Sequence, residues 1–139
     1  GGERRVTIRP PAPRSEREGG SAAVEFALLL PIVLLVLLAV VQVGVIARDR
    51  LVVWQAARAG ARVAAVDASD AAVTDAVHAA APQLDPDAMT ITIERSGTRG
   101  APVTVGVAYT ATTAGLLAGW LMPSSIALAA EATMRQEFG

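Results

Sequence analysis

The chain contains one long apolar stretch, from Phe26 to Ala47, in which no side chain is ionisable and only Gln42 is conventionally polar. As an α-helix these residues would extend about 33 Å, which matches the hydrocarbon core of a bilayer. Backbone amides inside a membrane must find hydrogen-bond partners within their own segment, and a single segment achieves this only as a helix. The stretch therefore predicts one transmembrane helix, assigned to residues 21–47.

The rest of the sequence has room for one small domain. The chain has 139 residues, so fewer than 100 follow the apolar stretch, and a domain of that size has a modest core. The chain has no cysteine, which excludes disulfides and thiolate metal sites. We expect residues 48–139 to form this domain and to depend on packing or assembly for stability.

Residues 1–20 have a different composition. They contain three prolines, five arginines and three glutamates, and they end in Gly-Gly. Such a segment buries too little apolar surface to offset its ordering entropy, so a disordered leader is expected. Arginines flanking a span favour the cytoplasmic side, which places the N-terminus in the cytoplasm and residues 48–139 outside it. Arg48 and Arg50 oppose this orientation.

The residues around the start of the apolar stretch resemble a known family. The run Gly20-Ser21-Ala22-Ala23-Val24-Glu25-Phe26-Ala27-Leu28, followed by Pro31, is similar to TadE-type pseudopilins of tight-adherence pilus systems. The run Gln55-Ala56-Ala57-Arg58-Ala59-Gly60-Ala61-Arg62 resembles the family's segment after the span, and Met134-Arg135-Gln136-Glu137 resembles its ending.

The resemblance implies that a prepilin peptidase cuts after Gly20 and leaves Ser21 as the new N-terminus. It also implies a minor pseudopilin in the bacterial cytoplasmic membrane that acts structurally in pilus or secretion-apparatus assembly. Its partners would be the membrane, the peptidase, other pilins and assembly platform proteins, in a hetero- or homo-oligomer. Whether the protein enters the fibre or stays at its base is left open, as is N-methylation of Ser21.

The chemistry of Gly20 and Glu25 can also be argued without the family. Glycine allows close backbone approach and conformations that other residues resist, which suits a scissile position. After cleavage, the Ser21 ammonium would lie about one helical turn from the Glu25 carboxylate, and pairing lowers the cost of holding either near hydrocarbon. Glu25 could pair within its own subunit or with a neighbour's amine. The alternative is a solvated carboxylate at a helix N-terminus, where the dipole favours it.

Further residues along the helix carry weaker signals. Pro31 removes one helical hydrogen bond and should kink the span. Arg58 and Arg62 are four residues apart and should share a face, and Gly60 would let another element approach closely, so we group these three as an assembly face. Trp54 is either an anchor at the membrane interface or a core residue.

From residue 48 the helix is expected to continue to Val66 without a break and to become amphipathic. Its predicted apolar positions recur at three- and four-residue spacing. They are Leu51, Val52, Ala56, Ala59 and Val63.

The remaining sequence predicts a short helix and three strands. Ser69 or Asp70 can cap a helix over residues 71–81, which ends before Pro82. Alternation with period two predicts a hairpin from Met89 to Tyr109 and a third antiparallel strand from Ile126 to Met134. The fold class is therefore α+β: a long N-terminal transmembrane and amphipathic helix, then a small pilin-like domain with a short helix and a three-stranded sheet. The apolar segment 114–123 is expected to cover the core, contact a partner or dip into the membrane.

The sequence gives little support for catalysis or ligand binding. The single histidine, His78, occurs in an alanine-rich helix, where a packed or surface side chain is more common than a metal ligand. We therefore expect no enzyme, catalytic residue, metal, cofactor, small-molecule substrate or nucleic acid. Two alternatives to a processed pseudopilin remain: an unprocessed single-span anchor carrying a binding domain, and a binding domain secreted after cleavage at Ala47.

Overall fold

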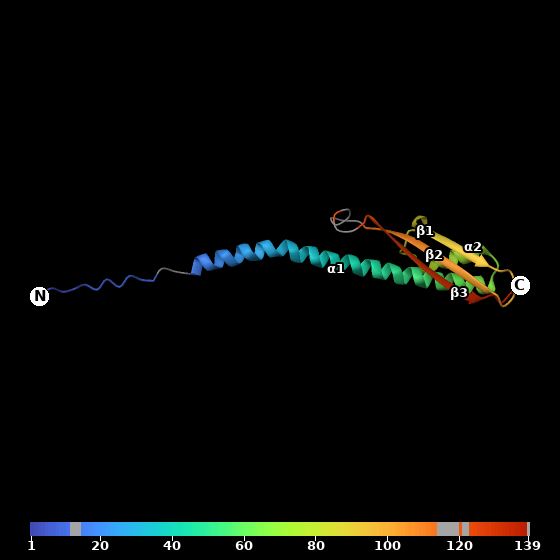
Figure 1. Ribbon diagram of the computed structural model, residues 1–139, viewed down its shortest axis with the longest axis horizontal. Helices are drawn as coiled ribbons and strands as arrows, with labels where there is room; N and C mark the ends of the chain where they lie inside the picture. Colours follow the sequence, from blue (N-terminus) through green and yellow to red (C-terminus); the bar gives the residue numbers. More distant parts are fainter. Residues whose placement is uncertain (12–14, 114–119, 121–122, 139) are drawn as a thin grey trace. The chain divides into compact units, whose positions relative to one another are not determined.

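The computed structural model describes residues 1–11, 15–113, 120 and 123–138 of the chain (Figure 1). The chain divides into two compact units, residues 1–38 and residues 39–139, and each is considered by itself. The elements are, in order, α1 (Ser15–Val66), α2 (Asp70–Ala80), the 3-10 turn η1 (Pro86–Ala88), β1 (Met89–Arg95), β2 (Pro102–Thr112) and β3 (Ser125–Arg135). These helices and strands confirm the predicted α+β class.

The first unit consists of an extended N-terminal segment and the beginning of α1. The large apolar side chains from Val24 to Leu37 are 40–68% exposed. The helical segment Glu18–Val66 contains an 18-residue window with a mean hydropathy of 3.0, and no part of that window is buried. By length and composition, α1 can therefore act as the single membrane anchor that the sequence predicts.

The helix begins earlier than the sequence suggested. A disordered leader was expected up to Gly20, whereas α1 begins at Ser15 and includes Gly19 and Gly20. Acidic residues such as Glu18 are favourable in the first turns of a helix, and a helix that is already nucleated extends at little cost. α1 also continues on both sides of Pro31, so this proline does not end the helix.

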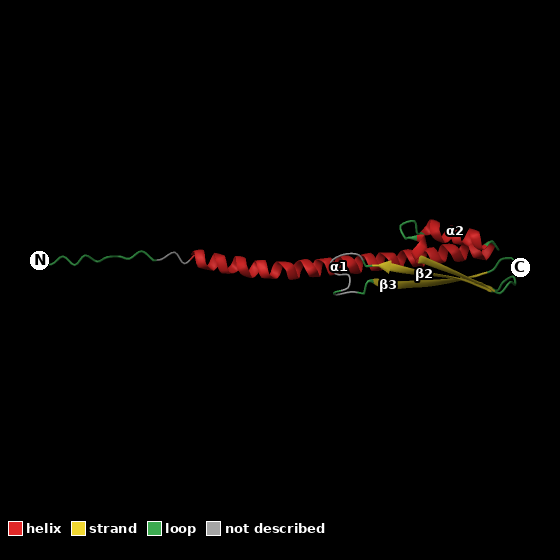
Figure 2. Ribbon diagram, turned by 90° about the horizontal axis from the view of Figure 1, so that it is seen from above, coloured by secondary structure: helices red, strands yellow, loops and turns green. Residues whose placement is uncertain are grey.

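In the second unit, the three strands form an antiparallel meander with the order β1-β2-β3. Gly97 and Gly100, in the turn between β1 and β2, have φ values of 77° and 81°, a region that suits glycine. The helical layer formed by α1 and α2 lies on one face of the sheet (Figure 2). The predicted hairpin and third strand are thereby confirmed.

The core lies between this helical layer and the inner face of the sheet. The sheet contributes valines from β2, of which Val103, Val105 and Val107 are at most 1% exposed. α1 contributes mainly alanine, which lets the helix approach the sheet closely. The buried α1 residues are Val52, Val53, Ala56, Ala57, Gly60, Ala61, Ala64 and Ala65.

The predicted apolar face of α1 was only partly right. Val52 and Ala56 are buried as expected, but Leu51 is 62% exposed and Ala59 and Val63 are half-buried. The buried residues occur in adjacent pairs, so the buried face of α1 is wider than the predicted face and is rotated around the helix axis relative to it. The reason is that α1 packs against both α2 and the sheet. Such a shift cannot be read from a helix in which nearly every residue is apolar.

Two side chains, those of Ser69 and Arg95, hold the region between α1 and β1. The Ser69 side chain accepts a hydrogen bond from the Ala72 amide at 3.3 Å and caps α2, as predicted. The Arg95 guanidinium at the end of β1 donates to the carbonyl of Ala68 at 2.7 Å and to that of Asp67 at 3.2 Å. It also forms an ion pair with Asp70. Arg95 thus fixes the turn between the two helices to the sheet.

Candidate functional site

The residues around the predicted cleavage position lie in the N-terminal part of α1 and are accessible. Gly20, Ser21 and Glu25 are all exposed, and a Cβ placed on Gly20 would meet no atom within 4 Å. Ser21 and Glu25 are four residues apart on one helix, so they occupy the same face. An enzyme or a second chain can therefore reach these residues without displacing a packed side chain of this protein.

Arg58 and Arg62 lie on an exposed part of α1, together with Trp54. We call these three residues the basic stripe. The Arg58 guanidinium carbon lies 4.6 Å from the centroid of the Trp54 ring, a cation-π contact. Trp54, Arg58 and Arg62 border a shallow hollow of about 370 Å³ together with Gln55 and Ala59.

Gly60 does not belong to this stripe, although the assembly face predicted from the sequence included it with the two arginines. It is buried, and a Cβ at this position would lie 2.6 Å from Val77 Cγ2 and 3.0 Å from Val105 Cγ1. Gly60 is therefore the point at which α1, α2 and β2 meet. The expectation that it permits a close approach is right, but the elements that approach belong to its own domain.

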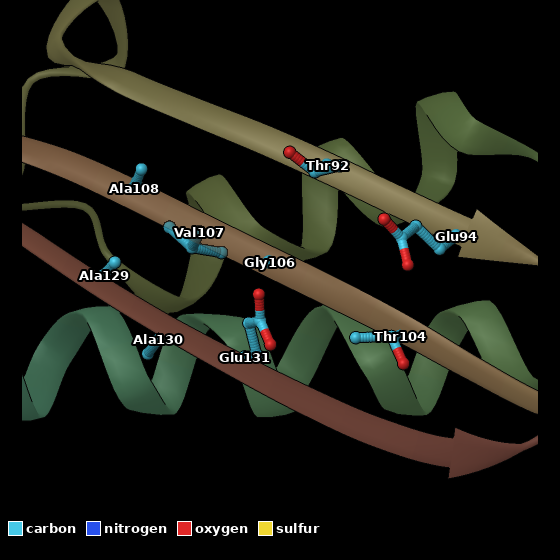
Figure 3. A pocket seen from close by; sticks show the side chains of 9 residues that line it. All are labelled: Thr92, Glu94, Thr104, Gly106, Val107, Ala108, Ala129, Ala130 and Glu131. Atoms are coloured by element: carbon cyan, nitrogen blue, oxygen red, sulfur yellow. The ribbon is translucent and has the colours of Figure 1, made fainter.

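The outer face of the sheet, on the side away from α1, carries a second surface. Gly106 of β2 is paired with Thr92 of β1 and with Glu131 of β3. The missing side chain leaves a hollow of about 140 Å³, with Glu94 and Glu131 at its border (Figure 3). Sequence reasoning missed this surface. The period-two pattern shows which residues point outward, but only the strand register shows that they surround Gly106.

A third, more apolar groove lies between α1 and β3. It is lined by Ala47, Arg50, Leu51, Trp54, Ala129 and Ala130. The segment 114–123, for which a core, interface or membrane contact was expected, lies largely outside the described residues. Trp120 within it is 76% exposed.

Metal binding finds no support in the described part of the chain. Among those residues, no group of three or more His, Cys, Asp or Glu side chains is placed to hold a metal ion. His78 is half-buried on α2.

Comparison with known proteins gives one match, and it lies within α1. Residues 20–62 match the family model described as TadE-like protein. No curated protein and no solved structure matches the chain. The matched residues include the motif from Gly20 to Glu25 and the segment that ends at Arg62, whereas the Met134–Glu137 motif lies outside the match. This segment is therefore similar to TadE-like proteins, and the match covers most of α1.

Proposed function

From this TadE-like segment we propose that the protein is a minor pseudopilin, processed by a prepilin peptidase and acting structurally in tight-adherence pilus assembly. The observation that carries the proposal is that the matched residues combine an accessible Gly20-Ser21 bond with an exposed apolar helix. Such a helix needs lipid or other apolar helices around it. A subunit that is first held in the membrane and then transferred into an assembly meets both needs.

In this proposal the peptidase acts on the first turns of α1. The Gly20 bond is helical in the free chain, so the enzyme must unwind the helix locally to obtain an extended substrate. Gly19 and Gly20 lower the cost of that step, since glycine is about 1 kcal/mol less favourable in a helix than alanine. Cleavage creates an ammonium at Ser21, which Glu25 can neutralise within the subunit or in a neighbour.

An unprocessed membrane anchor is the second candidate. The observation that favours it is the continuity of α1 through Gly19 and Gly20, since a stable helix resists proteolysis. In that case the second unit would be a binding domain that an intact helix anchors to the outer side of the cytoplasmic membrane.

The N-terminus of the protein from its native membrane separates these candidates. We expect intact mass and N-terminal sequencing to give a chain that starts at Ser21. Gly20→Leu should retain the leader, whereas Gly19→Leu, a matched control in equally open space, should still be cut. A wild-type chain that keeps its leader beside an active peptidase would support the unprocessed anchor, and a start at Arg48 would indicate a released domain.

The role of Glu25 requires a separate measurement. Glu25→Gln removes the charge but keeps the shape of the side chain, so the protein should remain in the membrane while the number of pili falls. Glu18→Gln is the control, because Glu18 is an exposed acid of the same helix that lies before the proposed cut. Normal piliation in Glu25→Gln would contradict the pairing role.

A further inference from the structure

The basic stripe is an exposed cationic surface without acids of its own. Between Arg50 and Val66, α1 carries three arginines and no acidic residue. Contact with Trp54 restricts the Arg58 side chain before any partner arrives, which reduces the entropy lost on binding. Among the described residues, the one ion pair is that between Arg95 and Asp70, so the charges of Arg58 and Arg62 are not neutralised within the subunit.

The outer face of the sheet has complementary properties. Glu94 and Glu131 are exposed and lie outside the Arg95–Asp70 ion pair. Their neighbours on this face are small, so the face is flat enough for a helix to lie on it. The outward residues around the two acids are Thr90, Thr92, Thr104, Gly106, Ala108, Ala127, Ala129 and Thr133. Arg135 is also outward, two side-chain rows from Glu131.

The spacing of the charges suits a contact between these surfaces. Arg58 and Arg62 are neighbours on a helix, with Cβ atoms roughly 6 Å apart. Glu94 and Glu131 are separated by two strand spacings and one side-chain row, which places their Cα atoms roughly 12 Å apart. Two arginine side chains that diverge from adjacent turns can reach both carboxylates while Trp54 lies over the small residues.

We propose that two copies of this chain associate head to tail, with the basic stripe of one copy on the outer sheet face around Glu94 and Glu131 of the next. The stripe belongs to α1, which is part of the helical layer on one face of the sheet (Figure 2), and Glu94 and Glu131 lie on the opposite face (Figure 3). The contact is therefore heterologous, and it leaves the sheet face of the first copy and the stripe of the second free to bind further copies. Such contacts build rings or open filaments. The inference deepens the proposed assembly role and rests on it.

A membrane surface is the competing occupant of the stripe. Anionic headgroups would attract Arg58 and Arg62, but they would leave the acidic sheet face without a partner. A second copy accounts for both surfaces at once, and charge complementarity of this kind favours specific orientation and fast association.

Crosslinking in the native membrane tests the contact, because the chain has no cysteine that could produce a background. Two differently tagged full-length variants are expressed together, one with Gln55→Cys beside the stripe and one with Ala108→Cys on the outer sheet face. A short bis-maleimide should join them into a mixed dimer. In the control, Asp75→Cys, at an exposed position of α2, replaces Ala108→Cys and should give little product.

Charge reversal then identifies the interaction. Arg58→Glu with Arg62→Glu should lower the mixed dimer about tenfold, equivalent to about 1.4 kcal/mol, and Glu94→Arg with Glu131→Arg should do the same. When both copies carry both pairs of substitutions, the charges are complementary again and the mixed dimer should return. High salt should weaken the wild-type product. All four residues are exposed, so the substitutions should leave the fold intact.

Two outcomes would overturn the contact. One is a crosslink that is insensitive to both reversals. The other is a stripe reversal that abolishes binding to phosphatidylglycerol vesicles and leaves the crosslink unchanged. N-terminal sequencing of the same samples keeps the two proposals distinct: a chain cut after Gly20 without a mixed dimer contradicts only the contact. A charge-dependent dimer of chains that retain the leader supports the contact and contradicts the processing.

Discussion

The two halves of α1 use opposite kinds of apolar residue. From Val24 to Leu37, large side chains are 40–68% exposed, whereas the buried positions from Val52 to Ala65 are occupied by alanine, valine and one glycine. A globular protein normally buries its largest apolar side chains. The reversal indicates that the environment, and not hydrophobicity alone, determines side-chain size along this helix.

The difference has a simple physical basis. Lipid tails are fluid and adapt to leucine and isoleucine of any shape, so large side chains are favourable along the apolar stretch. The packed part must fit between α2 and a sheet whose inner face is already filled by valines, so small residues are required there. Equal substitutions in the two halves should therefore have unequal effects on stability.

The largest contrast is expected for glycine. Gly60→Leu should lower the free energy of unfolding of the C-terminal unit by about 3 kcal/mol, because even a Cβ at this site lies 2.6 Å from Val77 Cγ2. Gly44→Leu is the matched control on the same helix, where no atom lies within 4 Å of the added Cβ. Thermal unfolding in detergent, followed by circular dichroism, measures both. Equal melting temperatures for the two variants would refute the contrast.

Removal of methyl groups should give the second contrast. Val105→Ala creates a cavity at a fully buried position and should cost about 2 kcal/mol. Val36→Ala, where the side chain is 57% exposed, should leave the same unfolding transition unchanged. Chemical denaturation in detergent gives the two values, and a comparable loss for Val36→Ala would mean that the apolar half contributes to the folded domain.

The smallest effect on stability is expected at the turn that follows the C-terminal half of α1. Arg95→Met removes hydrogen bonds to the carbonyls of Asp67 and Ala68 and should destabilise the domain by about 1–2 kcal/mol. Asp70→Asn should change stability by about 0.5 kcal/mol or less, because Asp70 is largely exposed and such ion pairs contribute little. Hydrogen exchange at the start of α2 provides the readout. Faster exchange in Asp70→Asn than in Arg95→Met would assign the stabilisation to the ion pair.

Much of the fold could be predicted because its signals are local. The cap at Ser69, the glycine turn after β1 and the period-two alternation of β2 each depend on a few neighbouring residues, and all three are present. The apolar helix was equally clear from the absence of charge. These features depend on backbone preference and solvent, which a single sequence records directly.

The errors and omissions concern contacts between distant parts of the chain. Leu51 was assigned to the core and Gly60 to an outer face because an almost uniformly apolar helix does not reveal which side meets the sheet. The hollow at Gly106 depends on the register of three strands, and the contacts of Arg95 join residues 27 and 28 positions apart. The cleavage position and the pairing of Glu25 depend on other proteins and stay predictions.

A backbone hydrogen bond, donated by the Glu137 amide to the Ala65 carbonyl at 2.8 Å, joins the residues just after β3 to the end of α1. This hydrogen bond affects when the domain can complete its folding during synthesis. α1 leaves the ribosome first, and its alanine-lined side stays uncovered until the strands follow. The bond that ties the last strand to this helix forms only after residue 137 has been added. A chain that stopped at Arg135 would contain every helix and strand of the described residues but lack this hydrogen bond, so it should be degraded more readily by proteases.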